Sequence, residues 1–487
     1  MIAAALALLA AGPVVVTDDG PIRGEAVRDG GVFRGIPYAK PPVGPLRWRA
    51  PERPVRWRMP IDTLAEHKAC PQPVYGDWNR KAADNSSEDC LFLDVRTPAL
   101  GAARLPVLVW IHGGGNRAGA GGGTVESAIA EDGIVVVSIQ YRLGALGFMS
   151  HAALGAENKG ASGNYALLDQ QLALQWVRRN IARFGGDPAQ VTIAGDSAGA
   201  QDVALHQLLP GSRGLFARAI QQSGTAGFGV APRSLVQNER LGALIGERAG
   251  LRAAATAAQL RALPVAAIIA AQEAVDVPDL DDDSFIWLQA IVDGAVLPDT
   301  PTRLLAAGRR APVPLIVGIN ARELTLHGGR AAAVATVRRE FGGNADRALS
   351  LYGLKVGQVA VDDPRLGDVS VQLANDLTFR CPTVALARLI AAQRGTVWQY
   401  QFDRDPPDGS AVAHGSELRY VFDEPRPGAP ALHQYWLNFI RTGDPNGGLP
   451  RWPRYDGQTR GYLSFTNAGE IEGRDLRGAI CALRDTP

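Results

Sequence analysis

Residues 191–199 read Val-Thr-Ile-Ala-Gly-Asp-Ser-Ala-Gly, and this stretch decides the fold. An apolar and β-branched run leads into Gly-x-Ser-x-Gly, and residues 198–209 continue with helical character. Strand, tight turn and helix in that order are the context in which Gly-x-Ser-x-Gly marks a nucleophile elbow. Glycine at 195 and 199 lets strand and helix pass closely, which pushes Ser197 out at the apex. An ordinary turn serine is the alternative, so the rest of the chain must support the motif.

The segments around this stretch predict an α/β architecture. Apolar runs of the kind found in buried strands occur at 105–111, 134–141, 314–319 and 396–402. Helical spacing of apolar residues predicts a long amphipathic helix over 165–184, which ends at Gly185–Pro188. Strands therefore alternate with helices, which predicts a mostly parallel sheet covered by helices on both faces. No repeat or linker interrupts residues 13–487, so one domain is expected.

Composition limits the classes of function. The 487 residues include 50 Lys or Arg and 49 Asp or Glu, which gives a net charge of +1. Nucleic-acid binding needs a basic footprint, and none is visible. No segment approaches the roughly 18 uninterrupted apolar residues of a membrane-spanning helix. We therefore expect a small-molecule substrate that is neutral or mildly charged.

The N-terminal residues and the cysteines indicate the cellular compartment of the protein. Residues 1–11 form an apolar run of signal-peptide length without a preceding basic residue. They are predicted to be a signal-peptide remnant of a secreted or periplasmic protein, and an Ala-rich disordered start is the alternative. The cysteines avoid the Cys-x-x-Cys spacing of metal and redox sites, and they are Cys70, Cys90, Cys381 and Cys481. They are expected to form disulfides if the leader is genuine, and to be four buried thiols otherwise.

Three further stretches complete a catalytic arrangement with Ser197. His112-Gly-Gly-Gly115 directly follows the strand at 105–111, and exposed backbone N–H groups there suit a developing oxyanion. Glu323 follows the strand at 314–319, and His414 lies in a loop beyond the strand at 396–402. Functional groups collect beyond the carboxyl ends of parallel strands. The chain order Ser, acid, His is also the order expected of a nucleophile elbow.

The usual pKa values of the side chains indicate a catalytic role for each of these residues. A serine hydroxyl is a poor nucleophile at neutral pH, so His414 is the predicted base for Ser197. Glu323 would hold the imidazole in the correct tautomer and stabilise the imidazolium. The N–H groups of Gly114, Gly115 and Ala198 would receive the oxyanion.

Several alternatives to these assignments remain open. His327 is near Glu323, but one short segment could hardly bring it to Ser197 and to Glu323 at once. Asp196 precedes the nucleophile and is expected to point away from it. Arg322 could form a surface ion pair with Glu323. The acidic stretch 279–283 could bind a cation, but a solvated loop is favoured because no calcium-loop pattern surrounds it.

Six stretches jointly resemble the type-B carboxylesterases, which include the cholinesterases, within the α/β-hydrolase fold. They are residues 33–38, 87–94, 110–115, 195–199, 222–224 and 414–418. The resemblance implies a serine carboxylesterase that forms an acyl-enzyme and needs no metal or organic cofactor. It assigns Ser197, Glu323 and His414 to the triad, and Gly114, Gly115 and Ala198 to the oxyanion hole.

The resemblance also implies supporting features. It pairs Cys70 with Cys90 and, from the larger family members, Cys381 with Cys481. It further implies a buried ion pair between Glu88 and Arg142, and a supporting serine, Ser223, near the acid.

Departures from the family pattern bear on the substrate. Asn116 replaces the aromatic residue that usually follows the glycines, and Leu324 replaces the Gly that commonly follows the acid. Trp78 could mimic the cation-binding tryptophan of cholinesterases, but Arg80 and Lys81 would repel a quaternary ammonium group. The alternatives to a carboxylesterase are a lipase or amidase with the same triad and a catalytically silent adhesion protein. The latter proteins typically lose the nucleophile, which this chain keeps.

Overall fold

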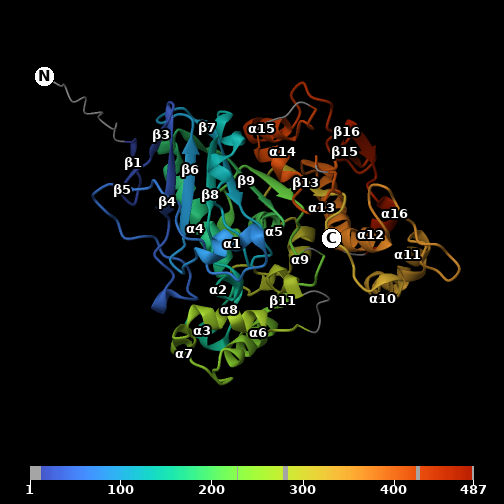
Figure 1. Ribbon diagram of the computed structural model, residues 1–487, viewed down its shortest axis with the longest axis horizontal. Coiled ribbons are helices and arrows are strands. Elements are labelled where there is room, and N and C mark those ends of the chain that lie inside the picture. Colours follow the sequence, from blue (N-terminus) through green and yellow to red (C-terminus); the bar gives the residue numbers. More distant parts are fainter. Residues whose placement is uncertain (1–11, 228, 278–282, 408, 424–427, 485–487) are drawn as a thin grey trace.

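An eleven-stranded sheet forms the centre of the computed structural model, which describes residues 12–227, 229–277, 283–407, 409–423 and 428–484 (Figure 1). The strand order is β16-β15-β14-β13-β10-β9-β7-β8-β6-β4-β3. The seven strands from β15 to β8 in this order pair in parallel. Antiparallel strands close both edges, with β16 on one side and β6, β4 and β3 on the other. The predicted parallel sheet is therefore present at the centre of a larger mixed sheet.

The central strands coincide with the apolar runs of the sequence. The strands of the large sheet are β3 (Glu25–Val27), β4 (Gly30–Pro37), β6 (Phe92–Thr97), β7 (Leu105–Ile111), β8 (Val135–Ile139), β9 (Gly186–Asp196), β10 (Arg218–Gln222), β13 (Leu315–Asn320), β14 (Val397–Asp403), β15 (Gly461–Thr466) and β16 (Gly469–Arg474). Two small sheets join β1 (Val14–Val16), β2 (Pro21–Arg23) and β5 (Ile61–Asp62), and β11 (Arg233–Ser234) with β12 (Ile291–Val292).

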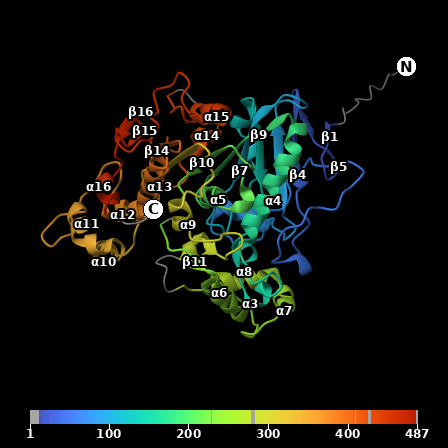
Figure 2. The same ribbon diagram turned by 180° about the vertical axis from the view of Figure 1, so that it is seen from behind.

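Helices cover both faces of the large sheet. Val107 and Val109 of β7 share an apolar cluster with residues of α4 (Tyr165–Asn180) and α13 (Cys381–Ala392). Leu108 and Trp110 share another with α15 (Leu432–Thr442). Because neighbouring strand residues point to opposite faces, α4 and α15 lie on opposite sides. Figure 2 shows α4 in front of the sheet. The predicted helix at 165–184 is confirmed, since a 3-10 turn, Ile181–Phe184, continues α4.

Most of the remaining helices form two groups beside the sheet (Figure 1). One group contains α2 (Gly144–Phe148), α3 (Ala152–Gly155), α6 (Leu235–Arg248), α7 (Ala257–Arg261) and α8 (Val265–Glu273). The other contains α10 (Gly329–Phe341), α11 (Ala345–Leu351), α12 (Val369–Asn375) and α16 (Gly478–Cys481). Of the other helices, α5 (Ala198–His206) packs against β9 and β10, and α14 (Leu418–Phe422) packs against α15. Two further helices are α1 (Asp77–Asp84) and α9 (Pro301–Ala306).

Both disulfides implied by the family resemblance are present, Cys70–Cys90 and Cys381–Cys481. The predicted signal-peptide remnant at 1–11 and residues 279–282 of the acidic stretch lie outside the described residues, so both predictions stand untested. Within the described ranges, no helix is long and apolar enough to cross a membrane. In the same ranges, no three His, Cys, Asp or Glu residues gather in a way that could hold a metal ion.

The predicted ion pair between Glu88 and Arg142 is wrong. Glu88 instead accepts two hydrogen bonds from Arg47, each 2.6 Å long. Arg142 follows β8 and reaches α4, where it donates to both carboxylate oxygens of Asp169 at 2.7 Å. The side chains of Arg142 and Asp169 are almost completely buried. Arg142 is therefore buried and Glu88 is partly buried, and each has a partner that the sequence motifs did not include.

Candidate active site

Ser197 alone forms the turn between β9 and α5. Its φ of 56° and ψ of −124° lie in a region that side-chain-bearing residues rarely adopt. The Ser197 N–H donates to the carbonyl of Gln222 on β10 at 2.8 Å, which fixes the turn to the sheet. A Cβ on Gly199 would lie 2.1 Å from the Ile111 carbonyl oxygen, and one on Gly195 would lie 2.5 Å from the Gly199 carbonyl carbon. Both glycines are therefore sterically required, as the elbow motif predicts.

The glycine loop after β7 lies against this turn. A Cβ on Gly113 would come within 3.1 Å of the Ser197 Cβ and 2.6 Å of the Asp196 carbonyl oxygen. Gly114 and Gly115 have φ values of 106° and 66°. Ala198 is the first residue of α5, and the first N–H groups of a helix have no partner within the helix. The loop and the helix start therefore bring backbone donors to the same place, next to Ser197.

Glu323 and His414 are in direct contact. His414 Nδ1 lies 2.5 Å from Glu323 Oε2. The other oxygen of Glu323 accepts hydrogen bonds from Ser223 Oγ at 2.9 Å and from the Asn320 N–H at 2.7 Å. The Glu323 side chain is fully buried, whereas one third of the His414 side chain is exposed. Ser223 therefore lies beside the acid, as the family resemblance implies.

The backbone places Ser197, the third member of the predicted triad, close to the loop that carries His414. Among the described residues, no hydrogen bond joins Ser197 Oγ to the His414 ring, and such bonds are often long before substrate binds. A Cβ on Gly415 would lie 4.0 Å from Asp196 Oδ2, so the loop of His414 approaches the nucleophile turn.

Three buried carboxyl groups surround the His414 ring. Burial lowers the pKa of His414, but the hydrogen bond to Glu323 and the charges of Asp196, Glu323 and Glu417 together raise it to about 9. Burial also raises the pKa of Asp196 well above its usual range, and it raises the pKa of Glu417. Glu417 accepts hydrogen bonds from Asn320 Nδ2 at 2.6 Å and Gln222 Nε2 at 3.2 Å. This environment favours the imidazolium form of His414.

The alternatives left open by the sequence have other surroundings. His327 is exposed. Arg322 donates to the carbonyl oxygens of Pro364 and Arg365. Asp196 is buried beneath the His414 loop, and His414 Nδ1 contacts Glu323 instead. Among the carboxylates weighed for this role, Glu323 is the one in hydrogen-bond contact with the His414 ring.

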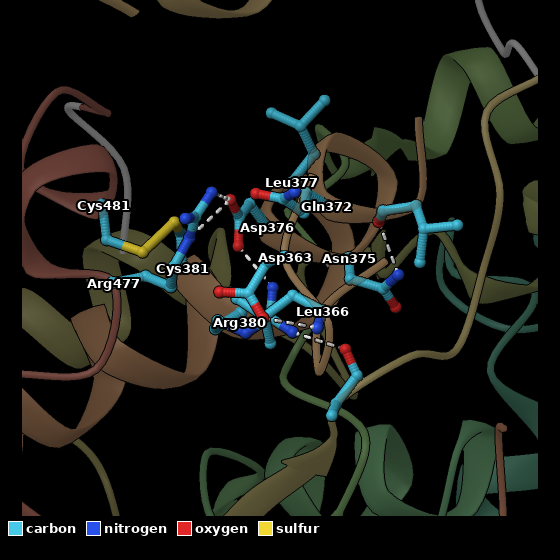
Figure 3. Close-up of polar contacts among 12 residues, drawn as sticks. Asp363, Leu366, Gln372, Asn375, Asp376, Leu377, Arg380, Cys381, Arg477 and Cys481 are labelled. Atoms are coloured by element: carbon cyan, nitrogen blue, oxygen red, sulfur yellow. Dashed lines mark hydrogen bonds and ion pairs between the residues drawn. A yellow bond between two sulfur atoms is a disulfide. The ribbon is translucent and has the colours of Figure 1, made fainter. Parts of the chain in front are cut away.

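The turn that carries Glu323 is held by Asn375, at the end of α12, and by Arg380 of the π-helical turn η8 (Asp376–Arg380). Figure 3 labels these two residues. Asn375 Oδ1 accepts the Leu324 N–H at 3.1 Å, and its Nδ2 donates to the Leu324 carbonyl at 2.9 Å. Arg380 donates to the Ala321 carbonyl at 2.7 Å. These contacts hold the backbone on both sides of Glu323, although Leu324 stands where the family commonly has Gly.

A buried ion triad anchors η8 (Figure 3). Asp376 contacts Arg380 and accepts a hydrogen bond from Arg477 at 2.7 Å. The side chains of Asp376 and Arg380 are fully buried. The disulfide Cys381–Cys481 begins at the next residue of the chain. The sequence motifs did not indicate Asn375, Asp376 or Arg380. Asp376 and Arg380 are four residues apart, but their contacts to Arg477 and Ala321, and those of Asn375 to Leu324, join residues distant in sequence.

Apolar side chains adjoin the nucleophile turn. Ala198, Leu288, Ile319 and Phe379 form a buried cluster, against which Leu324 packs. The rings of Phe379 and His414 lie 5.4 Å apart between centroids. A neighbouring cavity of about 1280 Å³ includes Phe285 and Leu377 in its wall but none of the predicted triad residues. Phe285 packs against the apolar cluster and also lines the cavity, so the cavity adjoins the cluster next to Ser197.

Comparison with known proteins agrees with this geometry. The sequence model of the carboxylesterase family matches residues 11–481. The chain belongs to the carboxylesterase family. It is 31% identical to para-nitrobenzyl esterase of Bacillus subtilis (strain 168), with 94% of the chain and 96% of that protein covered. It is 34% identical to carboxylesterase 1D of Rattus norvegicus, with 93% and 89% covered. Members of this family are carboxylic ester hydrolases, and the chain is an enzyme of that class.

Solved structures show the same fold. A crystal structure of a Geobacillus stearothermophilus carboxylesterase superposes with a TM-score of 0.81 and 30% identity, covering 97% of this chain and all of that one. A solved para-nitrobenzyl esterase structure gives a TM-score of 0.81 with 29% identity, covering 96% and 99%. The chain therefore has the α/β-hydrolase fold predicted from the sequence.

Proposed function

We propose that the chain is a serine carboxylesterase that hydrolyses small carboxylic esters through an acyl-enzyme on Ser197. The observation that carries the proposal is the 2.5 Å contact between His414 Nδ1 and Glu323 Oε2, in the chain that supplies Ser197 at a strained elbow. We further propose that residues 13–487 act as one catalytic domain.

The first half of the reaction forms the acyl-enzyme. Ser197 Oγ attacks the ester carbonyl while His414 Nε2 takes the hydroxyl proton. Glu323 accepts the Nδ1–H of the ring, which fixes the tautomer and stabilises the imidazolium. The carbonyl oxygen becomes an oxyanion, which the N–H groups of Gly114, Gly115 and Ala198 stabilise. The tetrahedral intermediate then collapses, and the leaving alkoxide takes the proton from His414.

The second half regenerates the enzyme. Water attacks the acyl carbonyl as His414 takes one of its protons, and the same backbone donors stabilise the second oxyanion. Collapse releases the carboxylic acid, and Ser197 Oγ recovers the proton from His414. The chain's own groups account for every proton transfer in this sequence.

The surroundings favour an apolar acyl or alcohol group. The buried cluster next to Ala198 consists of aliphatic and aromatic side chains. Trp78 on α1 is 64% exposed, so it does not form the enclosed aromatic site that a quaternary ammonium group needs. We therefore propose simple apolar esters, rather than choline esters, as substrates. Two disulfides further fit an oxidising compartment, which supports a secreted or periplasmic location.

The test is turnover of p-nitrophenyl acetate, butyrate and octanoate by the wild-type protein and by Ser197→Ala, with the pre-steady-state phase recorded. The proposal predicts a burst of about one equivalent of p-nitrophenol and loss of both burst and turnover in the variant. Folded wild-type protein that turns over none of the three esters would contradict a general esterase. Cleavage of the corresponding anilides at a similar rate would instead indicate an amidase.

A further inference from the structure

The departure from the family pattern at Asn116 has a partner inside the protein. The Asn116 side chain is fully buried, and its Nδ2 donates to Asp202 Oδ1 at 3.2 Å and to the Trp287 carbonyl at 3.4 Å. Asp202 belongs to α5, the helix that begins directly after Ser197. One hydrogen bond therefore joins the end of the glycine loop to the helix of the nucleophile.

Asp202 is the centre of a longer buried chain of polar groups. Gln170 of α4 donates from Nε2 to Asp202 Oδ2 at 2.5 Å. The Oε1 of Gln170 contacts His206 Nε2 at 2.8 Å, and His206 Nδ1 contacts Ser212 Oγ at 2.8 Å. All these side chains are fully buried or nearly so. The Trp287 carbonyl can only accept a hydrogen bond, so the Asn116 amide turns its NH₂ group toward that carbonyl and Asp202.

The loop needs such an anchor because of its backbone conformation. Gly114, Gly115 and Asn116 are three consecutive residues with positive φ, and Asn116 has a φ of 55°. Asparagine tolerates this region better than most residues but still at a cost, so surrounding contacts must hold it. The Asn116 carbonyl accepts the Gly144 N–H at 2.7 Å, and its side chain supplies the contact to Asp202.

We propose that Asn116 and Asp202 are positioning residues that hold the Gly114 and Gly115 N–H groups in place for the oxyanion. This inference rests on the proposed function, since it assigns a cause to the geometry of the proposed oxyanion hole. Neither side chain touches the substrate. The pair acts only through the backbone of the glycine loop, whose last glycine directly precedes Asn116.

A purely structural role makes a different prediction. If the pair only contributed to the stability of the core, its removal would lower the melting temperature without weakening transition-state binding in the folded protein. A positioning role predicts a lower kcat with little change in KM, and weaker binding of an inhibitor that places an oxyanion in the hole. A trifluoromethyl ketone is such an inhibitor, because Ser197 adds to its carbonyl to give a tetrahedral oxyanion.

Four variants separate these possibilities. Asp202→Ala removes the acceptor, and Asn116→Gly removes the amide while still allowing the positive φ. Asp202→Asn keeps an oxygen for Asn116, provided that the amide of Gln170 turns over to accept from the new NH₂ group. Asn238→Ala is the matched control, since Asn238 is a fully buried asparagine that donates to Phe148 and Ser150 instead of contacting the glycine loop.

The measurement is kcat and KM for p-nitrophenyl butyrate and the inhibition constant of the trifluoromethyl ketone, for variants shown to be folded by circular dichroism. Asp202→Ala and Asn116→Gly are expected to lower kcat by about 10- to 100-fold and to weaken the inhibitor by a similar factor. Their double variant should be no worse than either single one, because both remove the same contact. Asp202→Asn should recover most of the activity, and Asn238→Ala should change kcat by less than about twofold.

Several outcomes would overturn the inference. Folded Asp202→Ala or Asn116→Gly protein with kcat and inhibitor binding within about twofold of wild type would remove the positioning role. Equal losses in Asn238→Ala would reduce the effect to general loosening of the core. If Asp202→Ala does not fold, Asn116→Gly alone decides. A wild-type protein that neither hydrolyses the ester nor binds the ketone would overturn the proposed function, and this inference with it.

Discussion

Asp202 and Asp376 are both fully buried aspartates, yet their surroundings are opposite. Asp202 accepts hydrogen bonds from the amides of Gln170 and Asn116. Burial raises the pKa of Asp202 to about 7, and these hydrogen bonds offset the rise only in part. Burial also acts to raise the pKa of Asp376, but the charges and hydrogen bonds of Arg380 and Arg477 lower it. The partners of a buried carboxyl group, rather than its burial, therefore decide its charge.

The two aspartates also secure different parts of the active site. The Asp202 region holds the glycine loop through one amide, without a cation among the described residues that pairs with the carboxylate. The Asp376 region holds the turn of Glu323 through Arg380 and the neighbouring Asn375. We expect the Asp202 region to position the glycine loop while contributing little to the free energy of unfolding. We expect the Asp376 region to contribute strongly to that free energy.

The largest effect on catalysis is expected at the acid itself. Glu323→Gln keeps the shape of the side chain but removes the charge that orients and stabilises the His414 imidazolium. We expect kcat to fall by about 10³- to 10⁴-fold, which is far more than for any change in the Asp202 region. The substitution also lowers the pKa of His414, so the rise of residual kcat/KM with pH should move to lower pH. Steady-state kinetics across pH would contradict the assignment if kcat fell by less than in Asp202→Ala.

The largest effect on stability is expected at Asp376. Asp376→Ala leaves the fully buried Arg380 without its carboxylate, and such a loss typically costs about 3–5 kcal/mol. Asp202→Ala removes a carboxylate that has no cationic partner among the described residues, so its cost should be smaller, about 1–3 kcal/mol. Urea unfolding of both variants measures the difference. Equal losses would show that charge pairing does not distinguish the two regions.

A smaller effect is expected at Asn375. Asn375→Ala removes both hydrogen bonds to the backbone of Leu324 and leaves the ion triad of Asp376 intact. The Glu323 turn should loosen, and kcat should fall by about tenfold with KM nearly unchanged. Asn238→Ala again serves as the buried-asparagine control. An unchanged kcat in folded Asn375→Ala protein would show that Arg380 alone fixes the acid turn.

The two regions should also differ in the pH dependence of stability. The pKa of Asp202 is about 7 when folded and about 3.9 when unfolded, so the unfolded chain releases this proton first. Stability from this group therefore falls as pH rises from about 4 to 7, by at most about 1.4 kcal/mol per unit. Asp202→Asn should not lose this stability. Its melting temperature should therefore rise relative to that of the wild type as pH increases across the same range. A constant difference between pH 4 and pH 8 would refute the raised pKa.

The lowered pKa of Asp376 predicts the opposite trend. Its stabilising contribution is present above the unfolded pKa and is lost as pH falls through the lower folded pKa. Asp376→Asn should therefore approach wild-type stability only in strong acid, below about pH 4.

The sequence predicted the parts of the fold that have local signals. The elbow, β7, α4 and the Glu323–His414 pair lie where apolar runs, glycines and chain order placed them. The pattern of β6 is less clear, because it contains the charged residues Asp94 and Arg96, which are buried through contacts with distant partners. β16 has no apolar run, since it pairs with β15 at the edge of the sheet, where half of its residues are exposed and none is buried.

The supporting residues of the site had no local signal. Asp202 stands in a helix whose residues are all buried, so its polarity did not indicate which face it occupies. Asn375 and Glu417 act through contacts to residues 51 and 97 positions away. Arg142 could not be assigned to Asp169 rather than Glu88 from a motif, because both carboxylates lie in segments that reach the core. Such pairings depend on how the elements pack, which spacing along the chain does not encode.

The most direct test of the account is covalent labelling with a p-nitrophenyl alkylphosphonate, followed by peptide mass spectrometry. The account predicts one equivalent of label per chain, on the peptide that contains Ser197, with stoichiometric release of p-nitrophenol and loss of esterase activity. Ser197→Ala should take up no label, and Glu323→Gln should react much more slowly. Label found on another residue would contradict a mechanism in which Ser197 is the nucleophile. So would a protein that is active as an esterase but takes up no label at Ser197.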